Sequence, residues 1–172
     1  ILVTFHPETI SFEKNETYAD TLVETLQELS DNYQIVITMP NADTMGNIIR
    51  QRFSQLASNT SRIICVENFG TIGYLSCMKH ASFLLGNTSS GIIEAASLGK
   101  YVINLGDRQS GRARSKNIID VPINKNQILL SVQNLQQKTF KGKNIYRSEK
   151  NTSEKILLVL KDTFCKKISH SS

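Results

Sequence analysis

The sequence predicts an α/β fold, a doubly wound parallel sheet of the Rossmann-like type. Short apolar segments alternate with segments of helical periodicity at least five times along the 172 residues. The apolar segments are continuous rather than alternating in polarity, as in strands that are buried on both faces of a sheet. Polar residues and glycines follow these segments directly, so they should meet at the carboxyl edge, where ligands bind in open α/β sheets.

The first predicted strand covers residues 1–5 and begins at the first residue of the chain. We expect from this abrupt start that the chain is a fragment with a further segment upstream. Pro7 restricts His6 to an extended conformation, which should project its imidazole beyond the end of the strand. An alternative role for His6 is that of an ordinary loop histidine.

Three helices and two strands are expected between the first strand and residue 82. A helix over 15–30 has an apolar face of Tyr18, Leu22, Leu26 and Leu29 at helical spacing. Asn41 follows the second strand as either a ligand contact or a turn residue, and Phe69 follows the third strand. The other expected elements are a strand over 34–39, a helix over 44–57, a strand over 62–66 and a helix over 72–80, which presents Tyr74, Leu75 and Met78 inward.

The stretch from 82 to 105 is predicted to form a strand, a turn, a helix and a second strand. The apolar strand over 82–85 ends at Gly86, and β-branched residues favour a strand over 101–105. Between them, Ser89 or Ser90 is predicted to cap a helix that continues to Leu98 and stops at Gly99.

The start of this helix is a candidate phosphate site. Thr88, Ser89 and Ser90 offer hydroxyl donors, and Gly91 has no Cβ, so an anion could approach the free N–H groups of the first turn. Glu94 is placed about one turn further on, where its carboxylate could accept two hydrogen bonds from a ribose diol. The alternative is an ordinary capped helix in which Glu94 offsets the dipole.

Basic residues follow the strand over 101–105. Arg108 begins a cluster with Arg112, Arg114 and Lys116, and its planar guanidinium suits phosphate oxygens. Beyond this cluster the sequence predicts a short strand over 118–121, a helix capped by Asn124 and extending to about Gln136, a polar segment over 137–151, and a C-terminal helix over roughly 153–166.

Composition restricts the classes of function. The chain is 40% hydrophobic and 20% charged, as is typical of soluble globular domains, and its longest apolar runs are too short to span a bilayer. No signal peptide is visible. Three scattered cysteines (Cys65, Cys77 and Cys165) favour a reducing cytoplasm. No metal-ligand cluster, GxGxxG, Walker lysine or GxSxG motif occurs, so we expect no metal and no cofactor.

Charge is distributed unevenly between the two halves. Residues 1–70 hold nine acids and four bases, whereas residues 71–172 hold six acids and sixteen bases. A basic half can indicate nucleic acid binding, but no basic motif interleaved with aromatic residues accompanies it. We therefore expect neither a nucleic acid nor a membrane as partner.

Four motifs, in this order over residues 1–121, resemble the hydrolysing UDP-N-acetylglucosamine 2-epimerases of bacterial sialic acid and legionaminic acid synthesis. They are His6-Pro7-Glu8-Thr9, Pro40-Asn41, the segment from Gly86 to Glu94, and Asn104-Leu105-Gly106-Asp107-Arg108-Gln109-x-Gly111-Arg112. The last motif is specific to the hydrolysing type, as opposed to the non-hydrolysing epimerases.

The resemblance implies a two-domain enzyme of the glycosyltransferase-B type. Residues 1–172 would form a single domain, the C-terminal nucleotide-binding half, while an N-terminal domain of the same protein would carry the acid/base carboxylates. The implied site has His6 beside the diphosphate and sugar, Asn41 and the Phe69 backbone at the uridine, Thr88 and Ser89 at the phosphates, Ser90 and Gly91 completing the turn, Glu94 at the ribose hydroxyls, and Arg108 at the diphosphate.

The implied reaction is an anti elimination of UDP to 2-acetamidoglucal, followed by hydration to N-acetylmannosamine. The isolated chain is expected to bind UDP weakly and to turn over nothing, and we expect the full-length protein to be a homo-oligomer. Two alternatives remain open: the donor-binding domain of a glycosyltransferase of the same architecture, and a non-catalytic module that senses nucleotide sugars or is purely structural.

Overall fold

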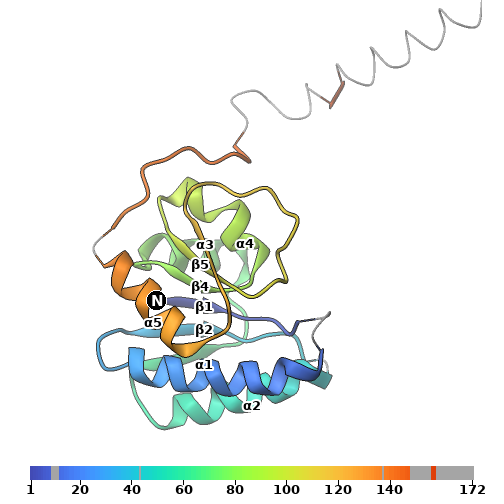
Figure 1. Ribbon diagram of the computed structural model, residues 1–172, viewed down its shortest axis with the longest axis vertical. Helices are drawn as coiled ribbons and strands as arrows, with labels where there is room; N and C mark the ends of the chain where they lie inside the picture. The colour runs from blue at the N-terminus through green and yellow to red at the C-terminus, as the bar shows by residue number, and fades with distance from the viewer. Residues whose placement is uncertain (9–11, 43, 137, 148–155, 158–172) are drawn as a thin grey trace, which may run out of the picture.

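Six parallel strands form a single sheet in the computed structural model, in the order β3-β2-β1-β4-β5-β6 (Figure 1). The structure describes residues 1–8, 12–42, 44–136, 138–147 and 156–157. The strands are β1 (Leu2–Thr4), β2 (Ile35–Thr38), β3 (Ile63–Val66), β4 (Leu84–Gly86), β5 (Val102–Leu105) and β6 (Ile118–Val121). The strand order reverses between β1 and β4, and in sheets of this kind the crevice at that point is where ligands bind.

The helices lie where periodicity predicts them, and the predicted ends of the elements agree with the structure within about two residues, one region excepted. The α-helices are α1 (Asn15–Leu29), α2 (Thr44–Ser58), α3 (Gly70–His80), α4 (Ser89–Ile93) and α5 (Lys125–Leu135), with 3-10 turns η1 (Phe12–Lys14) and η2 (Ala95–Leu98). Asn124 caps α5, as predicted, and accepts a hydrogen bond from the Gln127 amide at 3.2 Å. The C-terminal helix expected over 153–166 lies outside the described residues, apart from helical Ile156 and Leu157.

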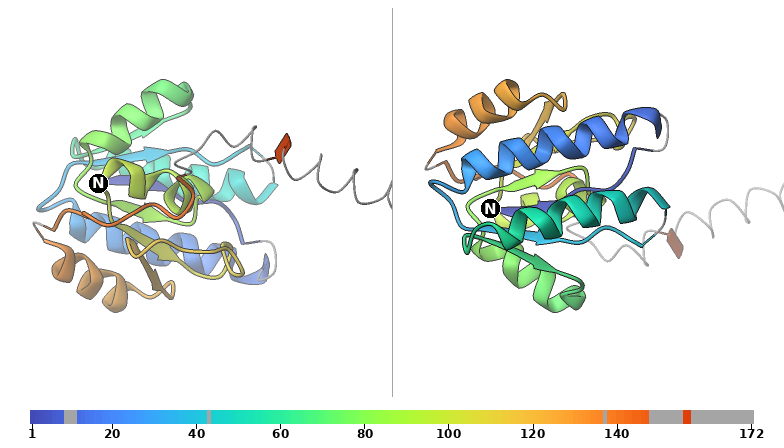
Figure 2. Two further views of the ribbon diagram at one scale, coloured as in Figure 1. Left: turned by 90° about the horizontal axis from the view of Figure 1, so that it is seen from above. Right: turned by 90° about the horizontal axis from the view of Figure 1, so that it is seen from below.

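Helices cover both faces of the sheet, which explains why the strands are apolar throughout. One face packs against α1, α2 and α5, and the other packs against α3, α4 and η2 (Figure 2). Alternate residues of each strand point to opposite faces of the sheet, where two hydrophobic clusters form. Val3 and Leu85 lie in the larger cluster, whereas Leu2 and Leu84 lie in the smaller one. The predicted apolar face of α1, with Leu22 and Leu26 fully buried, lies in the larger cluster.

The helix after β4 is the region that differs from the prediction. It is α4 for five residues and continues as the tighter 3-10 turn η2, with Glu94 at the junction. The residue before the helix is Thr88, whose backbone is extended and whose side chain makes no capping hydrogen bond, so a cap by Ser89 or Ser90 is wrong. A 3-10 turn is a common way to end a short helix, and Gly99 terminates it in the left-handed conformation at φ +69°, as expected.

Strand β4 approaches β1 so closely at Gly86 that only glycine fits. Gly86 has φ +140°, and a Cβ built on it would lie 1.9 Å from the carbonyl oxygen of Thr4. The close approach lets the next residue, Asn87, donate its backbone N–H to the same Thr4 oxygen at 3.1 Å. Gly86 therefore places Asn87 directly beyond the end of β1.

Candidate functional site

Asn87 joins the loops that follow β1 and β4. Its side chain is fully buried, its Oδ1 accepts the His6 backbone N–H at 2.8 Å, and its Nδ2 donates to the His6 carbonyl oxygen at 2.8 Å. The side-chain amide of Asn87 thus bonds to both backbone groups of His6, as the backbone of a neighbouring strand would in a sheet. His6 thus lies at the carboxyl edge, as the sequence predicts, and the strand order places it at the switch point between β1 and β4.

The loop after β5 is attached to the same asparagine. Gln109 Nε2 donates to the Asn87 carbonyl oxygen at 2.7 Å, and Arg108 Nη1 lies 3.4 Å from the same oxygen. The backbone N–H of Arg108 also points to Glu8 Oε1 at 3.3 Å. The loops after β1, β4 and β5 therefore converge: His6 and Arg108 both contact Asn87, which directly precedes Thr88.

The segment from Thr88 to Gly91 presents polar groups at this junction. The length of the helix and the role of Gly91 differ from the prediction. Thr88, Ser89 and Ser90 are half-buried, and the first-turn N–H groups have no intrahelical acceptor. Because α4 has only five residues, fewer peptide dipoles align than in the helix that was predicted. Gly91 is buried and faces β5: a Cβ there would lie 3.1 Å from Val102 Cγ1, so a side chain at residue 91 would have to push the Val102 methyl aside.

Tyr74 of α3 lies close to the same loops. The helical spacing of residues 72–80 predicts only that its side chain packs inward. Its hydroxyl is 3.2 Å from Thr4 Oγ1, which is in turn 2.7 Å from Thr38 Oγ1. Burial raises the pKa of Tyr74 above its ordinary value, and this outweighs the opposing effect of hydrogen bonds with Thr4 and Thr88. Tyr74 is therefore a neutral hydroxyl that connects the interior of the sheet to Thr88.

The raised pKa of Tyr74 predicts a loss of stability in alkali. The folded state retains the phenolic proton more tightly than the unfolded state, so the free energy of unfolding falls as pH rises past the unfolded pKa of about 10. Tyr74→Phe keeps the ring and removes the titrating group. Urea unfolding between about pH 9 and about pH 11 should show a shallower decline for this variant than for the wild type. Equal slopes would contradict this prediction.

Glu94 leaves one acceptor unused. Its side chain is half-buried, and Oε2 is buried without a hydrogen-bond partner among the described residues. An unpaired buried carboxylate oxygen is unfavourable, and a small rotation that brought it to a ligand hydroxyl would relieve this cost. Glu94 also borders a hollow of about 330 Å³, lined in addition by Leu75, Ile93, Ser97, Leu98, Asn144, Tyr146 and Arg147.

Asn41 and Phe69 lie at the same edge but in a second group of loops, after β2 and β3. Arg50 of α2 joins these two loops: Nη1 donates to the Pro40 carbonyl oxygen at 2.9 Å, and Nη2 donates to both carboxylate oxygens of Glu67 at 2.6 and 2.7 Å. Asn41 is exposed, whereas Phe69 is half-buried and directly precedes α3. The contacts of Asn87 thus order His6 and Arg108, while Asn41 and Phe69 are positioned separately.

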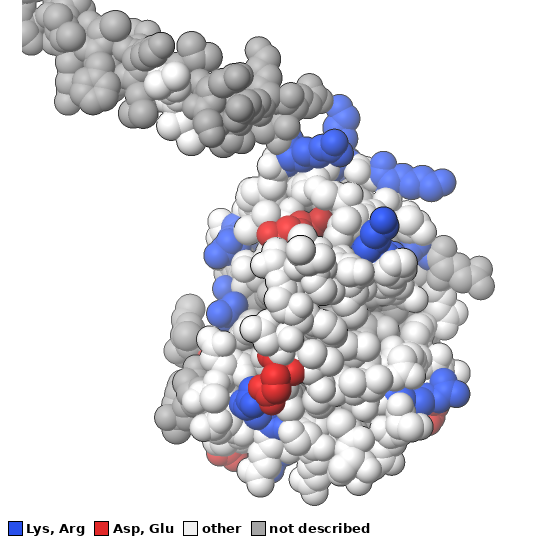
Figure 3. Space-filling model, turned by 180° about the vertical axis from the view of Figure 1, so that it is seen from behind, with Lys and Arg blue, Asp and Glu red and all other residues white. Residues whose placement is uncertain are grey.

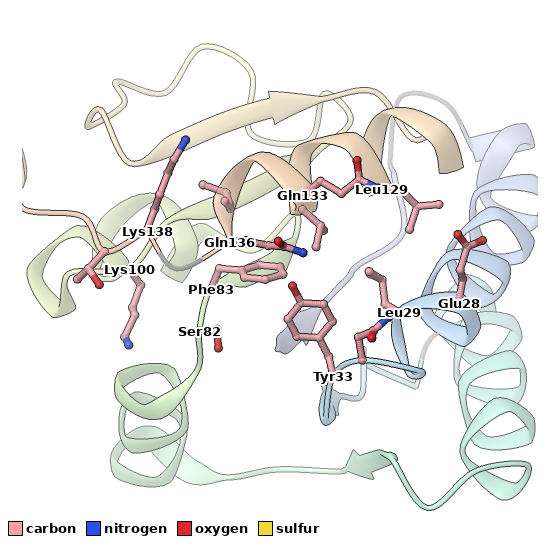
Figure 4. A pocket seen from close by; sticks show the side chains of 14 residues that line it. Glu28, Leu29, Tyr33, Ser82, Phe83, Lys100, Leu129, Gln133, Gln136 and Lys138 are labelled. Carbon is pink, nitrogen blue, oxygen red and sulfur yellow. The ribbon is translucent and has the colours of Figure 1, made fainter.

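A larger pocket, of about 610 Å³, lies at the opposite edge of the sheet (Figure 4). Figure 4 shows Tyr33 and Phe83 on one side, and Gln133 of α5 and Gln136, which directly follows α5, on the other. Phe83 directly precedes β4, so this pocket is at the amino ends of the strands. No residue of the predicted site lines it.

Three features of the described residues are relevant to nucleic acid, membrane and metal binding. Lys and Arg side chains on the face shown in Figure 3 form separate small groups with uncharged surface between them. The described helices include none with the length and apolarity needed to cross a membrane. No cluster of three or more His, Cys, Asp or Glu side chains in the described ranges is arranged to hold a metal ion.

The sheet order and the paired helical layers define a Rossmann-like domain of the glycosyltransferase-B type. In solved structures the fold recurs in the UDP-GlcNAc 2-epimerase of Neisseria meningitidis bound to UDP-GlcNAc, with a TM-score of 0.74 at 19% identity over 94% of this chain and 44% of that one. It also recurs in the heptosyltransferase WaaC of E. coli with ADP, with a TM-score of 0.58 at 15% identity over 78% and 43% of the two chains.

The chain belongs to the UDP-N-acetylglucosamine 2-epimerase family, whose model matches residues 1–161. It is 38% identical over 143 residues to the GDP/UDP-N,N'-diacetylbacillosamine 2-epimerase (hydrolyzing) of Campylobacter jejuni, covering 81% of this chain and 36% of the relative. It is 33% identical over 139 residues to the polysialic acid biosynthesis protein P7 of Escherichia coli, covering 81% and 35%. The chain therefore spans little more than a third of the length of these curated relatives.

Sequence reasoning missed the residues that hold the site together. Asn87, Gln109 and Glu8 stand inside the quoted motifs but were assigned no role, and Tyr74 was assigned to the core. The available signal was their position: each of the first three lies within four residues of the end of a strand at the carboxyl edge. Their contacts depend on the packing of distant loops and could not be derived from spacing.

Proposed function

We propose that this chain is the UDP-binding half of a hydrolysing UDP-N-acetylglucosamine 2-epimerase, or of a relative acting on a 2,4-diacetamido sugar. The family membership and the hydrolysing relative of C. jejuni support the reaction class. The chain covers 36% of that relative, which supports a second, N-terminal domain in the whole protein. That domain would supply the acid/base carboxylates.

The observation that carries the proposal is the convergence of three loops on Asn87 at the switch point of the sheet. A diphosphate at this junction would meet the hydroxyls of Thr88 and Ser89 and the guanidinium of Arg108. Ser90 and Gly91 would contribute backbone N–H groups from the first turn of α4. Phosphate contacts from a planar guanidinium and oriented N–H groups are strong because donor and acceptor are charged or preorganised.

Glu94 and the second group of loops would bind the nucleoside. The unpaired Oε2 of Glu94 supports a role as acceptor from the ribose hydroxyls. Asn41 and the Phe69 backbone would lie at the uracil, on the β2 and β3 side of the sheet. UDP would then extend along the carboxyl edge, with the uridine toward α3 and the diphosphate toward the loop after β5.

In the reaction, the chain's own residues would stabilise the leaving group. When the bond from the anomeric carbon to UDP breaks, negative charge develops on the diphosphate oxygens, and donors already fixed around them lower the barrier. Arg108 and the N–H groups of the α4 turn are such donors. His6, at the end of β1, would lie between the diphosphate and the sugar and is the catalytic residue that this half contributes.

Glu94→Ala and Arg108→Ala are each expected to weaken UDP binding by roughly 1.5–3 kcal/mol, because each removes hydrogen bonds in which one of the two groups is charged. Isothermal titration calorimetry with UDP measures this directly. Matched controls are Glu24→Ala and Arg62→Ala, which change exposed residues on α1 and at the amino end of β3. Unchanged affinity in both site variants would exclude the proposed site.

Product analysis separates the epimerase from a glycosyltransferase. The full-length protein, incubated with UDP-N-acetylglucosamine and no acceptor, is expected to release free N-acetylmannosamine and UDP. The 172-residue chain alone is expected to release neither, because it lacks the carboxylates of the second domain. Absolute dependence on an acceptor sugar would contradict the epimerase assignment.

A further inference from the structure

We propose that Glu8 is a positioning residue that orients Arg108 toward the diphosphate, an inference that rests on the proposed function. Glu8 is a glutamate that is only 5% exposed, two residues beyond His6. A buried carboxylate beside a site for an anion would by itself oppose binding. A contact of Glu8 that strengthens the site would offset this unfavourable effect on anion binding.

The backbone of Glu8 is held rigidly. Its N–H donates to Oδ1 of Asn15 at 2.7 Å, and Nδ2 of Asn15 donates to its carbonyl oxygen at 2.9 Å. Asn15 is fully buried at the start of α1. The side chain of Glu8 therefore extends from a fixed point between α1 and the loop after β5.

The Glu8 carboxylate contacts the turn that carries Arg108. Oε1 lies 3.3 Å from the backbone nitrogen of Arg108 and accepts its N–H. The same oxygen would lie 2.7 Å from a Cβ at Gly106, which has φ +66°. A side chain at residue 106 would therefore displace the Glu8 carboxylate from its position beside the 106–108 turn.

This contact determines how Arg108 can act. Because the N–H of Arg108 is occupied by Glu8, its guanidinium is the part left for a ligand. Nη1 of that guanidinium lies 3.4 Å from the Asn87 carbonyl oxygen. Glu8 and Asn87 therefore hold Arg108 at its two ends, one through the backbone and one through the side chain.

The test compares Glu8→Ala with Glu8→Gln, using UDP and uridine as separate ligands in calorimetry. Glu8→Ala is expected to weaken UDP binding about tenfold, because Arg108 is no longer oriented, and to leave uridine binding unchanged. Glu8→Gln keeps an oxygen acceptor and should restore UDP affinity to within about threefold of the wild type. Glu24→Ala, an exposed glutamate on α1, is the matched control.

A double-mutant cycle distinguishes positioning from a general loss of structure. In an Arg108→Ala background, Glu8→Ala should cause little further loss of UDP affinity, since the group it positions is gone. Additive losses, or an equal fall in uridine affinity, would overturn the proposal.

Hydrogen exchange of the Arg108 amide, measured without ligand, keeps this inference separate from the proposed function. We expect faster exchange in Glu8→Ala than in the wild type, and an unchanged rate would show that the contact is unimportant. A wild-type chain that bound no UDP, yet showed this acceleration, would contradict the proposed function and retain the Glu8–Arg108 contact.

Discussion

Gly86→Ala is expected to destabilise the fold by more than about 3 kcal/mol, the range of substitutions that force a backbone shift in a core. The new Cβ would lie 1.9 Å from the Thr4 carbonyl oxygen and 2.6 Å from its carbon. These are backbone atoms of the neighbouring strand, so relief requires β1 and β4 to separate at the switch point. Urea unfolding followed by circular dichroism measures the loss as a lower midpoint.

Gly111→Ala is the control that isolates the steric effect. Gly111 also has a positive φ, of +81°, but a Cβ there would meet no atom within 4 Å. This variant should lose only about 1 kcal/mol, the cost of the left-handed conformation for alanine. Similar losses in the two variants would show that the close approach of β4 to β1 does not control stability.

Asn87→Ala is expected to impair both folding and UDP binding. It removes the two hydrogen bonds to the backbone of half-buried His6, each 2.8 Å long. Removing one partner of a hydrogen bond inside a protein costs about 1–3 kcal/mol, so we expect a loss of about 2–4 kcal/mol in unfolding free energy. UDP affinity should fall more than tenfold, because the loop that carries His6 is no longer held against the loop that leads to Thr88.

Asn87→Asp is the matched variant for this prediction. It keeps an acceptor for the His6 N–H and replaces the donor to the His6 carbonyl oxygen by a second oxygen. Its stability should therefore be no better than that of Asn87→Ala, because a buried charge faces a carbonyl oxygen without a proton between them. Wild-type stability in Asn87→Asp would contradict the role assigned to Asn87 Nδ2.

Much of the fold could be predicted because a parallel sheet leaves two clear signs in the sequence, continuous apolar strands and polar loops after them. Continuous apolar segments such as Ile35–Thr38 identify strands covered on both faces, and right-handed connections then bring the loops after them to one edge. The residues that follow the strands could therefore be expected to meet at one edge: His6, Asn41, Phe69, Thr88–Ser90 and Arg108. The contacts of Asn87 bring the loops of His6 and Arg108 together. Asn41 and Phe69 instead lie in the separate group of loops after β2 and β3.

The remaining features depend on packing that spacing does not encode. Helical periodicity alone does not show that the segment after β4 divides at Glu94 into α4 and η2. Helical spacing predicts that Tyr74 faces the core. It does not show that the Tyr74 hydroxyl points to Thr4, because that depends on the direction of the side chain in the folded protein. Asn87 sits within a polar run, where the sequence does not show which side chain turns inward.

On this proposal, UDP binds at the carboxyl edge, over the junction made by Asn87. The most direct measurement is an NMR titration of the ¹⁵N-labelled chain with UDP. We predict shifts of the backbone amides of Thr88–Gly91 and Gly106–Arg108, with those of Tyr33, Phe83 and Gln136 around the opposite pocket unchanged. Shifts confined to that opposite pocket, or none at all at millimolar UDP, would contradict it.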